Sequence, residues 1–258
     1  MLSRQRAERR LREALEQDLL VLEYQPIVDF VGGRIVGAEA LIRMKDVDDG
    51  GKLLGPDMFI DVAEDTGLVV EVDSWVIEAA IAQVAAWGDR IGKDGVPPWV
   101  AINVSPRSME HPRVVRRLVD AVKDGEVPKD RIKVELTEHS FLGALPGSEA
   151  SLLSLMAAGV PVGIDDFGTG YSAMAYLQRF DLDFMKIDRS FVANVGQAER
   201  ADAVVTAIVD LAHAHGMRVT AEGVETTRQA RRLREIGCDY AQGYHFGRPG
   251  PPGRIVRG

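Results

Sequence analysis

The sequence has very little cysteine: Cys238 is the only one among its 258 residues. A single cysteine cannot form a disulfide within the chain, so nothing in the sequence indicates an oxidising compartment. Metal sites built from several thiolates are excluded for the same reason. We therefore expect a cytoplasmic protein whose fold does not depend on disulfide bonds.

Long apolar runs are absent as well. No segment approaches the ~20 apolar residues of a membrane-spanning helix, and the N-terminal stretch MLSRQRAERRLREALEQDLL is charged throughout, unlike a signal peptide. Leu11, Leu15 and Leu19 recur at i+4 spacing, which predicts an amphipathic helix leading into the fold. We expect residues 1–19 to form a connector helix, and residues 250–258, rich in Gly and Pro, to form a flexible tail.

The chain also lacks an excess of positive charge, because its net charge is -8. This balance argues against a general nucleic-acid binder. It does not exclude a small anionic substrate, since a bound metal ion inverts the field of an acidic site.

The sequence does contain a regular alternation of strand-like and helix-like segments. The predicted strands span residues 19–29, 33–44, 99–105, 132–138, 161–167, 184–191, 217–224 and 239–246. Alternation of this kind predicts a parallel sheet, and eight such units in a chain of this length predict a closed barrel. Only the turn FVG (30–32) joins the first two strands, so they must be antiparallel. The predicted fold is α/β, a modified TIM (β/α)8 barrel with an antiparallel first strand.

The competing architecture is a doubly wound open sheet. A dinucleotide-binding sheet of that type carries a glycine fingerprint directly after an early strand. The early glycines here occur in VGGRIVG, which lacks that spacing and lies in the predicted hairpin. The barrel is therefore favoured.

Polar residues occur near the C-terminal end of every predicted strand after the first: Glu39, Asn103, Glu135, Asp165, Lys186, Glu222 and Gln242. The C-terminal ends of barrel strands meet at one face, where active sites are built. Side chains of the same parity point to the same side of a strand, so these residues can converge on one pocket. A single strand-end glutamate is more often paired with Arg or Lys, but the repetition over seven strands favours a shared site.

Several carboxylates in one pocket require a compensating cation. Oxygen ligands suit Mg²⁺ or Mn²⁺. The adjacent Asp165 and Asp166 then have a function, because one carboxylate can bridge two ions while its neighbour binds the second. Two ions at short separation are the arrangement for in-line attack on a phosphodiester. The DFG triplet at 166–168 is not a kinase motif here, since no glycine-rich loop or HRD accompanies it.

Seven motifs in order resemble the EAL domain family: GAEALIR, NVSP, ELTE, DDFGTGYS, KIDRSFV, AEGVET and YAQGYHFGRP. The resemblance runs from about Leu20 to Pro249, and we expect residues 20–249 to form this domain. It implies a modified barrel and a phosphodiesterase that opens cyclic di-GMP to linear pGpG. It also implies a homodimer, and coupling or fusion to sensor or GGDEF-type domains. No nucleic-acid or membrane partner is expected.

Matching positions suggest roles for individual residues. The resemblance implies a first metal site of Glu39, Asn103, Glu135 and Asp165, and a second of Asp165, Asp166 and Glu222. It implies that Lys186 holds or helps deprotonate the attacking water, and that Glu138 anchors loop 167–172 near the second metal and the dimer contact. The positions matching substrate-binding residues are Gln25, Leu41, Arg43, Arg189 and Gln242, with Pro106, Tyr244, Phe246 and Pro249 flanking a guanine.

Two other functions compete with hydrolysis. One is a receptor that binds cyclic di-GMP without cleaving it; such relatives lack ligands or have a degraded loop after the Asp pair, whereas this chain keeps both. The other is an aldolase-like barrel that uses Lys186 as a Schiff base, which requires a desolvated lysine and not one surrounded by carboxylates. Met44 and the stretch 45–56 depart from the family pattern without removing a ligand.

Overall fold

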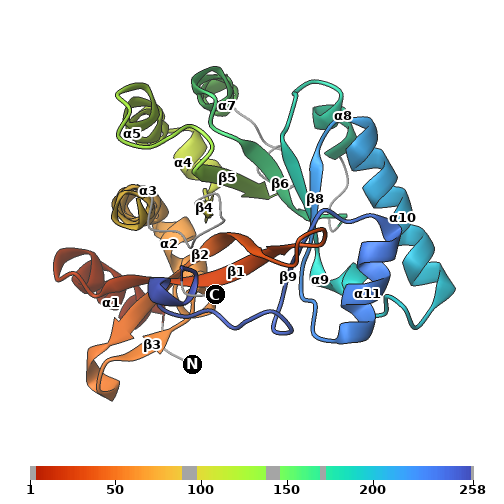
Figure 1. The fold of residues 1–258 in the computed structure, drawn as a ribbon. Helices are drawn as coiled ribbons and strands as arrows, with labels where there is room; N and C mark the ends of the chain where they lie inside the picture. The colour runs from red at the N-terminus through yellow and green to blue at the C-terminus, as the bar shows by residue number, and fades with distance from the viewer. Residues whose placement is uncertain (1–3, 89–97, 138–145, 169–172, 257–258) are drawn as a thin grey trace.

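The computed structural model describes residues 4–88, 98–137, 146–168 and 173–256 (Figure 1). One sheet has the strand order β1-β9-β8-β7-β6-β5-β4-β2-β3, and β1 also pairs with β2, which closes eight of the strands into a barrel. The strands are β1 (Leu20–Asp29), β2 (Ile35–Asp46), β3 (Lys52–Leu54), β4 (Trp99–Asn103), β5 (Ile132–Thr137), β6 (Val162–Phe167), β7 (Phe184–Ile187), β8 (Arg218–Ala221) and β9 (Tyr240–Gln242). The predicted α/β barrel is confirmed.

Helices surround the barrel and cover its apolar outer surface (Figure 1). The α-helices are α1 (Arg4–Glu16), α2 (Ile60–Thr66), α3 (Val69–Trp87), α4 (Pro106–Met109), α5 (Pro112–Lys123), α7 (Pro146–Ala158), α8 (Ala173–Leu177), α9 (Arg189–Val192), α10 (Glu199–Ala214) and α11 (Thr227–Ile236). Short 3-10 helices are η1 (Val47–Asp49), η2 (Pro56–Met58) and η3 (Pro252–Arg254). Among the described residues, no helix is long and apolar enough to cross a membrane.

The antiparallel first strand is also confirmed. β1 runs antiparallel to both of its barrel neighbours, β2 and β9. The remaining barrel contacts, from β2 through β4 to β9, are parallel. Because β1 is the one reversed strand, the C-terminal ends of the other seven meet at the same end of the barrel, which we call the mouth.

Several strand predictions need correction. The stretch 45–56 contains a strand that the sequence did not reveal, β3, which pairs with the end of β2 outside the barrel. The predicted strands 217–224 and 239–246 end early, at Ala221 and Gln242, and the predicted strand 184–191 ends at Ile187. Asp188 ends it, because its side chain accepts a hydrogen bond from the Ser190 backbone and caps helix α9.

A layer of aromatic side chains fills the barrel beneath the mouth, two or four residues before the polar strand ends. The ammonium of Lys133 lies 3.8 Å from the Trp99 ring centroid, 5.4 Å from that of Phe184 and 5.6 Å from that of Tyr240. Gly163 makes room for these rings, since a Cβ there would lie 2.4 Å from Phe184. We call Trp99, Lys133, Phe184 and Tyr240 the floor.

Both ends of the described chain pack against the barrel. Leu11 and Ala14 of α1 are buried in the main apolar core. At the other end, Gly250 exchanges two backbone hydrogen bonds with Tyr24, of 2.8 and 3.1 Å, and Ile255 is buried. The described part of the predicted flexible tail is therefore anchored by contacts that its Gly and Pro content did not indicate. The domain limits at residues 19 and 249 stay a prediction.

Candidate active site at the mouth of the barrel

Lys186 lies at the centre of the mouth and is surrounded by four carboxylates. Its Nζ lies 2.6 Å from Glu222 Oε1, 2.8 Å from Glu135 Oε2, 3.2 Å from Asp165 Oδ1 and 3.4 Å from Glu39 Oε2. The lysine side chain is only 1% exposed. Residues from five strands or strand ends, far apart in the sequence, therefore meet as the parity of the strands predicted.

Amide side chains hold the other side of Glu39. Asn103 Nδ2 donates to Glu39 Oε1 at 2.8 Å, and Gln242 Nε2 donates to Glu39 Oε2 at 2.6 Å. Gln242 Nε2 also donates to Gln25 Oε1 at 3.0 Å, and Gln25 Nε2 donates to the Gly247 carbonyl at 3.2 Å. This chain of hydrogen bonds fixes the position of the Glu39 carboxylate. The Gln242 Oε1 atom is buried without a hydrogen-bond partner among the described residues.

The local backbone explains how the adjacent Asp165 and Asp166 reach the same pocket. Consecutive residues of a regular strand point to opposite faces. Here the β6–β7 register shifts between Ile164 and Phe167, and Asp166 has a left-handed φ of 53°. The Asp166 N–H donates to Asp165 Oδ1 at 2.9 Å. An irregularity of this kind re-aims a side chain next to a site, and Asp is among the few residues that tolerate this conformation.

The carboxylates cannot all be ionised comfortably around one ammonium. Burial raises the pKa of Glu135 well above its ordinary value, and it raises that of Glu222 to about 8 and that of Asp166 to about 6. Burial also acts against ionised Glu39, but the charge of Lys186 and the amide hydrogen bonds hold its pKa below the ordinary value. The site therefore has more negative groups than its own residues can balance.

The pKa of Lys186 shifts in the direction that favours its charged form, although its partner Glu135 shifts toward neutrality. Burial opposes the ammonium, but Asp165, Glu135, Glu222 and Glu39 together raise the pKa of Lys186 well above its ordinary value. One ammonium is shared by several carboxylates. Each carboxylate receives only part of its compensation, so burial still raises the pKa of Glu135, whereas the ammonium is stabilised by all of them. We accordingly regard Lys186 as charged and the carboxylates as short of positive charge.

Two groups of oxygen ligands fit divalent cations. One consists of Glu39, Glu135 and Asp165, and the other of Asp165, Asp166 and Glu222; within each group the ligand atoms lie within 4.8 Å of one another. Asp165 belongs to both groups, as expected for a bridging carboxylate. Every donor is an oxygen, which suits Mg²⁺ or Mn²⁺ and not a softer metal. The shortage of positive charge and the donor set both match such ions.

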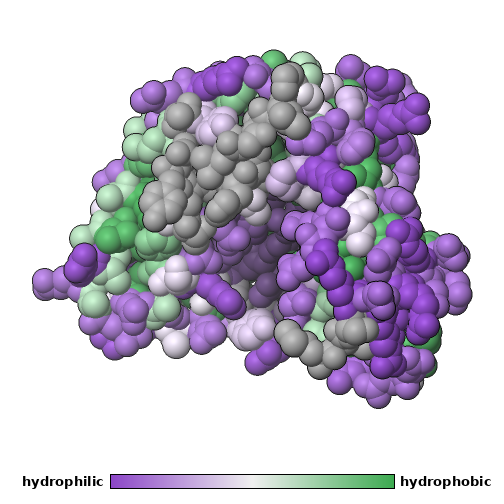
Figure 2. All heavy atoms as spheres, turned by 180° about the vertical axis from the view of Figure 1, so that it is seen from behind, coloured by the Kyte–Doolittle hydropathy of each residue, from purple (hydrophilic) through white to green (hydrophobic). Residues whose placement is uncertain are grey.

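A polar cavity of about 240 Å³ opens above these groups. Figure 2 views the molecule from behind Figure 1 and shows a hollow surrounded by hydrophilic residues near the centre of that face, in keeping with the polar lining of the cavity. The lining residues are Gln25, Glu39, Asp165, Lys186, Arg189, Glu222, Gly223, Glu225, Gln242, Gly243 and Tyr244. Four predicted substrate positions, Gln25, Arg189, Gln242 and Tyr244, therefore lie beside the acidic residues.

Sequence reasoning missed Glu225, Gly223 and Gly243 as lining residues. Glu225 follows Glu222 by three positions in AEGVET. Its position just beyond a predicted strand end could have indicated that it lines the mouth. Gly243 is required where it lies, because its φ is 155° and a Cβ would come within 2.1 Å of the Val224 carbonyl oxygen. That close approach fixes the turn that leads to Tyr244.

Other predicted substrate residues lie around the site without lining this cavity, as far as the described chain shows. Leu41 and Arg43 follow Glu39 on β2, and Arg43 Nε donates to Glu23 Oε2 at 2.8 Å. Pro106 begins α4, and Pro249 is partly buried beside Gly250. Phe246 packs edge-on against Phe30, with ring centroids 6.3 Å apart.

Two predictions about the loops fall outside the described residues. Glu138 lies in the stretch 138–145, and most of loop 167–172 lies in 169–172. Their assigned roles stay predictions.

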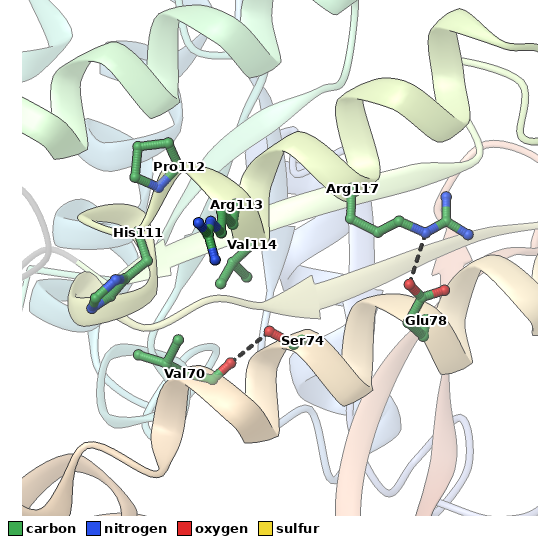
Figure 3. Close-up of a pocket in the computed structure, with 8 residues that line it drawn as sticks. All are labelled: Val70, Ser74, Glu78, His111, Pro112, Arg113, Val114 and Arg117. Atoms are coloured by element: carbon green, nitrogen blue, oxygen red, sulfur yellow. Dashed lines mark hydrogen bonds and ion pairs between the residues drawn. The ribbon is translucent and has the colours of Figure 1, made fainter.

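A larger cavity, of about 540 Å³, lies between α3 and α5 (Figure 3). Its polar groups are largely engaged: Arg117 Nε donates to Glu78 at 2.7 Å, and Ser74 Oγ donates to the Val70 carbonyl at 2.7 Å. Neither of the two carboxylate groups described above lies there. The clustering of acids around Lys186, and not cavity size, identifies the candidate site.

Comparison with known proteins agrees with this geometry. The EAL domain family model matches residues 8–249. Similar proteins include the signaling protein YkoW of Bacillus subtilis, 38% identical over 94% of this chain and 30% of YkoW. The cyclic di-GMP phosphodiesterase NbdA of Pseudomonas aeruginosa is 36% identical over 95% of this chain and 30% of NbdA. The chain spans about a third of the length of the curated relatives that it matches.

Solved structures give the same result. The MucR phosphodiesterase in complex with c-di-GMP superposes with a TM-score of 0.84 at 36% identity, over 97% of this chain and 99% of that one. The EAL enzyme Bd1971, in a form with cAMP and cyclic di-GMP bound, has a TM-score of 0.90 at 32% identity, over 98% of this chain and 68% of that one. Sequence, fold and acidic mouth agree, and the chain belongs to the EAL domain family.

Proposed function

We propose that the chain is a metal-dependent phosphodiesterase that hydrolyses cyclic di-GMP to linear 5′-pGpG. The observation that carries the proposal is the pair of carboxylate groups that share Asp165 and surround Lys186. Relatives support the substrate, since NbdA is named a cyclic di-GMP phosphodiesterase and the MucR phosphodiesterase was solved with c-di-GMP.

Each ligand group has a role in this proposal. Glu39, Asn103, Glu135 and Asp165 would hold one ion, and Asp165, Asp166 and Glu222 would hold the second. Mg²⁺ or Mn²⁺ bound there would polarise the phosphodiester and lower the pKa of water, so that attack occurs near neutral pH. Gln242 and Asn103 keep Glu39 oriented through the two hydrogen bonds to its carboxylate.

The remaining residues position water and substrate. Within the described chain the Lys186 ammonium contacts carboxylate acceptors, and we assign it the role of a donor that would hold the attacking water and the developing negative charge. Water attacks phosphorus and the bond to the 3′-oxygen breaks, which leaves a 5′-phosphate on one nucleotide and a 3′-hydroxyl on the other. Substrate contacts are assigned to Gln25, Leu41, Arg43, Pro106, Arg189, Gln242, Tyr244, Phe246 and Pro249. Arg43 and Arg189 suit the phosphates.

Assembly and context are further parts of the proposal. A homodimer whose contact includes loop 167–172, with Glu138 as the anchor of that loop, would be seen by sedimentation velocity. Coupling to sensor or GGDEF-type domains is supported by the length of the relatives, among them MucR, named a bifunctional diguanylate cyclase and cyclic di-GMP phosphodiesterase. A cytoplasmic location stays a prediction.

The test compares the wild type with two matched variants, using cyclic di-GMP with Mg²⁺ or Mn²⁺ and chromatography of the products. Glu39→Gln keeps the size of a ligand and removes its charge, and we expect kcat to fall on the order of 10²–10³-fold. Asp210→Asn makes the matched change on exposed α10 and should keep the wild-type rate. Wild-type rates in Glu39→Gln would refute the site. Tight binding of cyclic di-GMP without product would instead identify a receptor.

A further inference from the structure

The end of β2 leaves the closed barrel before it reaches the predicted substrate residues. Pairing of β2 with β4 stops at Ala40 opposite Ile102. We call residues 41–46 the β2 extension: residues 41–44 pair with β1 on one side, and residues 44–46 pair with the three-residue β3 on the other. Leu41 and Arg43 therefore lie on a narrow ribbon that the barrel itself does not support on both sides.

Helix α1 braces this ribbon through Arg10. Arg10 Nη1 donates to Asp46 Oδ2 at 3.1 Å, and Nη2 lies 3.0 Å from Asp46 Oδ1, so the guanidinium grips the carboxylate with two prongs. The two side chains are 11% and 13% exposed. Arg10 also contacts Asp48 just beyond Asp46, and the Lys45 N–H donates to the Leu19 carbonyl at 2.8 Å. Two-pronged, largely buried pairs of this kind are geometrically specific.

The braced end is directly linked to Arg43. Asp46 follows Arg43 by three residues on the same strand. Arg43 shares the parity of Glu39 and is held by Glu23, with side chains 15% and 25% exposed. Glu23 lies on β1, which begins four residues after α1 ends. Helix α1 thus contacts β2 directly through Arg10 and Asp46, and a short link joins it to β1, which carries the Glu23 partner of Arg43.

Neighbouring arginines on α1 make different contacts. Arg9 lies 3.7 Å from Glu13, and Arg12 lies 2.9 Å from Glu8, both one turn away on the same helix. These exposed pairs do not reach the β2 extension. They provide a control with the same change of charge on the same helix.

We propose that Arg10 is a positioning residue for substrate binding, which holds the β2 extension so that Leu41 and Arg43 keep their place at the mouth. The inference rests on the proposed function of those two residues. It extends the substrate-binding unit to a helix that the sequence indicates only as a connector. Glu39, the proposed metal ligand on the same strand, lies before the extension and is paired with both β1 and β4, so we expect loss of the brace to leave it in place.

The kinetic test uses Arg10→Gln, with Arg9→Gln as the control. Loss of the brace should raise the KM for cyclic di-GMP by about tenfold, the scale of losing a supporting contact, with kcat unchanged. Arg9→Gln should leave both constants at wild-type values, and Arg10→Lys should recover part of the affinity because it keeps the charge. A fall in kcat with unchanged KM would overturn the assignment.

A second readout needs no activity. Hydrogen–deuterium exchange of the amides in residues 41–54, without substrate, should become faster in Arg10→Gln and stay unchanged in Arg9→Gln. Asp46→Asn approaches the same contact from the other side, and it keeps an oxygen that can accept from the Asp48 N–H. Unchanged exchange in both variants, or faster exchange throughout the chain, would refute a local brace. If the chain binds cyclic di-GMP without cleaving it, the Kd is measured in place of KM. Failure of the proposed hydrolysis can then be told apart from failure of the proposed role of Arg10.

Discussion

Two lysines lie inside the same barrel in opposite surroundings. Lys186, in the mouth, contacts four carboxylates. Lys133, in the floor, has the faces of three aromatic rings near its ammonium. Lys133 precedes Glu135 by two residues on β5, so one strand contributes to both layers.

The two environments move the pKa values of these lysines in opposite directions. In the mouth the surrounding acids outweigh burial and raise the pKa of Lys186. In the floor burial prevails over the more distant Glu135 and Asp183, and lowers the pKa of Lys133 to about 8. Ring faces attract a cation but do not neutralise it. Both lysines are buried, so burial alone does not set the direction of the pKa shift. The groups around the ammonium do: carboxylates stabilise its charged form, and aromatic rings do so less.

The largest expected effect comes from removing the mouth lysine. Lys186→Met leaves the carboxylates without their internal cation and deprives the reaction of a preorganised donor. We expect kcat to fall on the order of 10²–10³-fold, measured by formation of pGpG. Lys133→Met is the matched change in the floor and should keep kcat near the wild-type value. An equal fall in kcat in Lys186→Met and Lys133→Met would show that the mouth lysine has no special role in the reaction.

A smaller effect follows from adding metal. Ions that bind the folded mouth should raise Tm, because binding to the native state alone stabilises it by mass action. At a metal concentration 100 times Kd the gain is about 2.7 kcal/mol. Thermal denaturation with Mg²⁺ or Mn²⁺, and then with excess EDTA, measures it. Asp165→Asn removes the negative charge of the shared ligand and should reduce the shift, whereas Lys133→Met should retain it. An equal shift in Asp165→Asn would place the bound ion elsewhere.

The smallest expected effect is the pH dependence of the free energy of unfolding that Lys133, in the floor, contributes. Lys133 has a folded pKa of about 8, below the ~10.4 of an unfolded lysine. Between these values the unfolded chain binds more protons, so this residue makes the stability of the protein rise as pH increases. Chemical denaturation of the wild type and Lys133→Met, from pH 7.5 to 10.5, should show the wild type gaining relative to the variant. A constant difference would mean that Lys133 keeps an ordinary pKa.

The sequence was sufficient for the mouth because strand parity is a strong constraint. Glu39, Asn103, Glu135, Asp165, Lys186, Glu222 and Gln242 meet as predicted, through side chains that share one face of each strand. The same parity places Lys133 and Phe184 one layer lower, but nothing in the sequence indicates that glycines on other strands make room for rings. That arrangement depends on the register between adjacent strands, which sets Gly163 of β6 opposite Phe184 of β7.

Local features were harder to predict than the layers. The left-handed Asp166 and its register shift depend on contacts between β6 and β7 that no short stretch of sequence encodes. Strand β3 consists of three residues in a glycine-containing segment, too short for an alternating pattern to be visible. Arg10 is one of several arginines in α1, and only the fold distinguishes the one that reaches β2.

The aromatic floor has a consequence for the passage of molecules through the site. Trp99, Phe184 and Tyr240 occupy the barrel directly beneath the acidic mouth, and a barrel of this kind is a packed core and not a pore. In the proposed reaction, a cyclic dinucleotide would therefore enter, and its opened product would leave, through the mouth and not through the floor. If the proposed hydrolysis occurs, the linear product must leave before the next substrate can enter, so accumulated product would compete with substrate for the mouth.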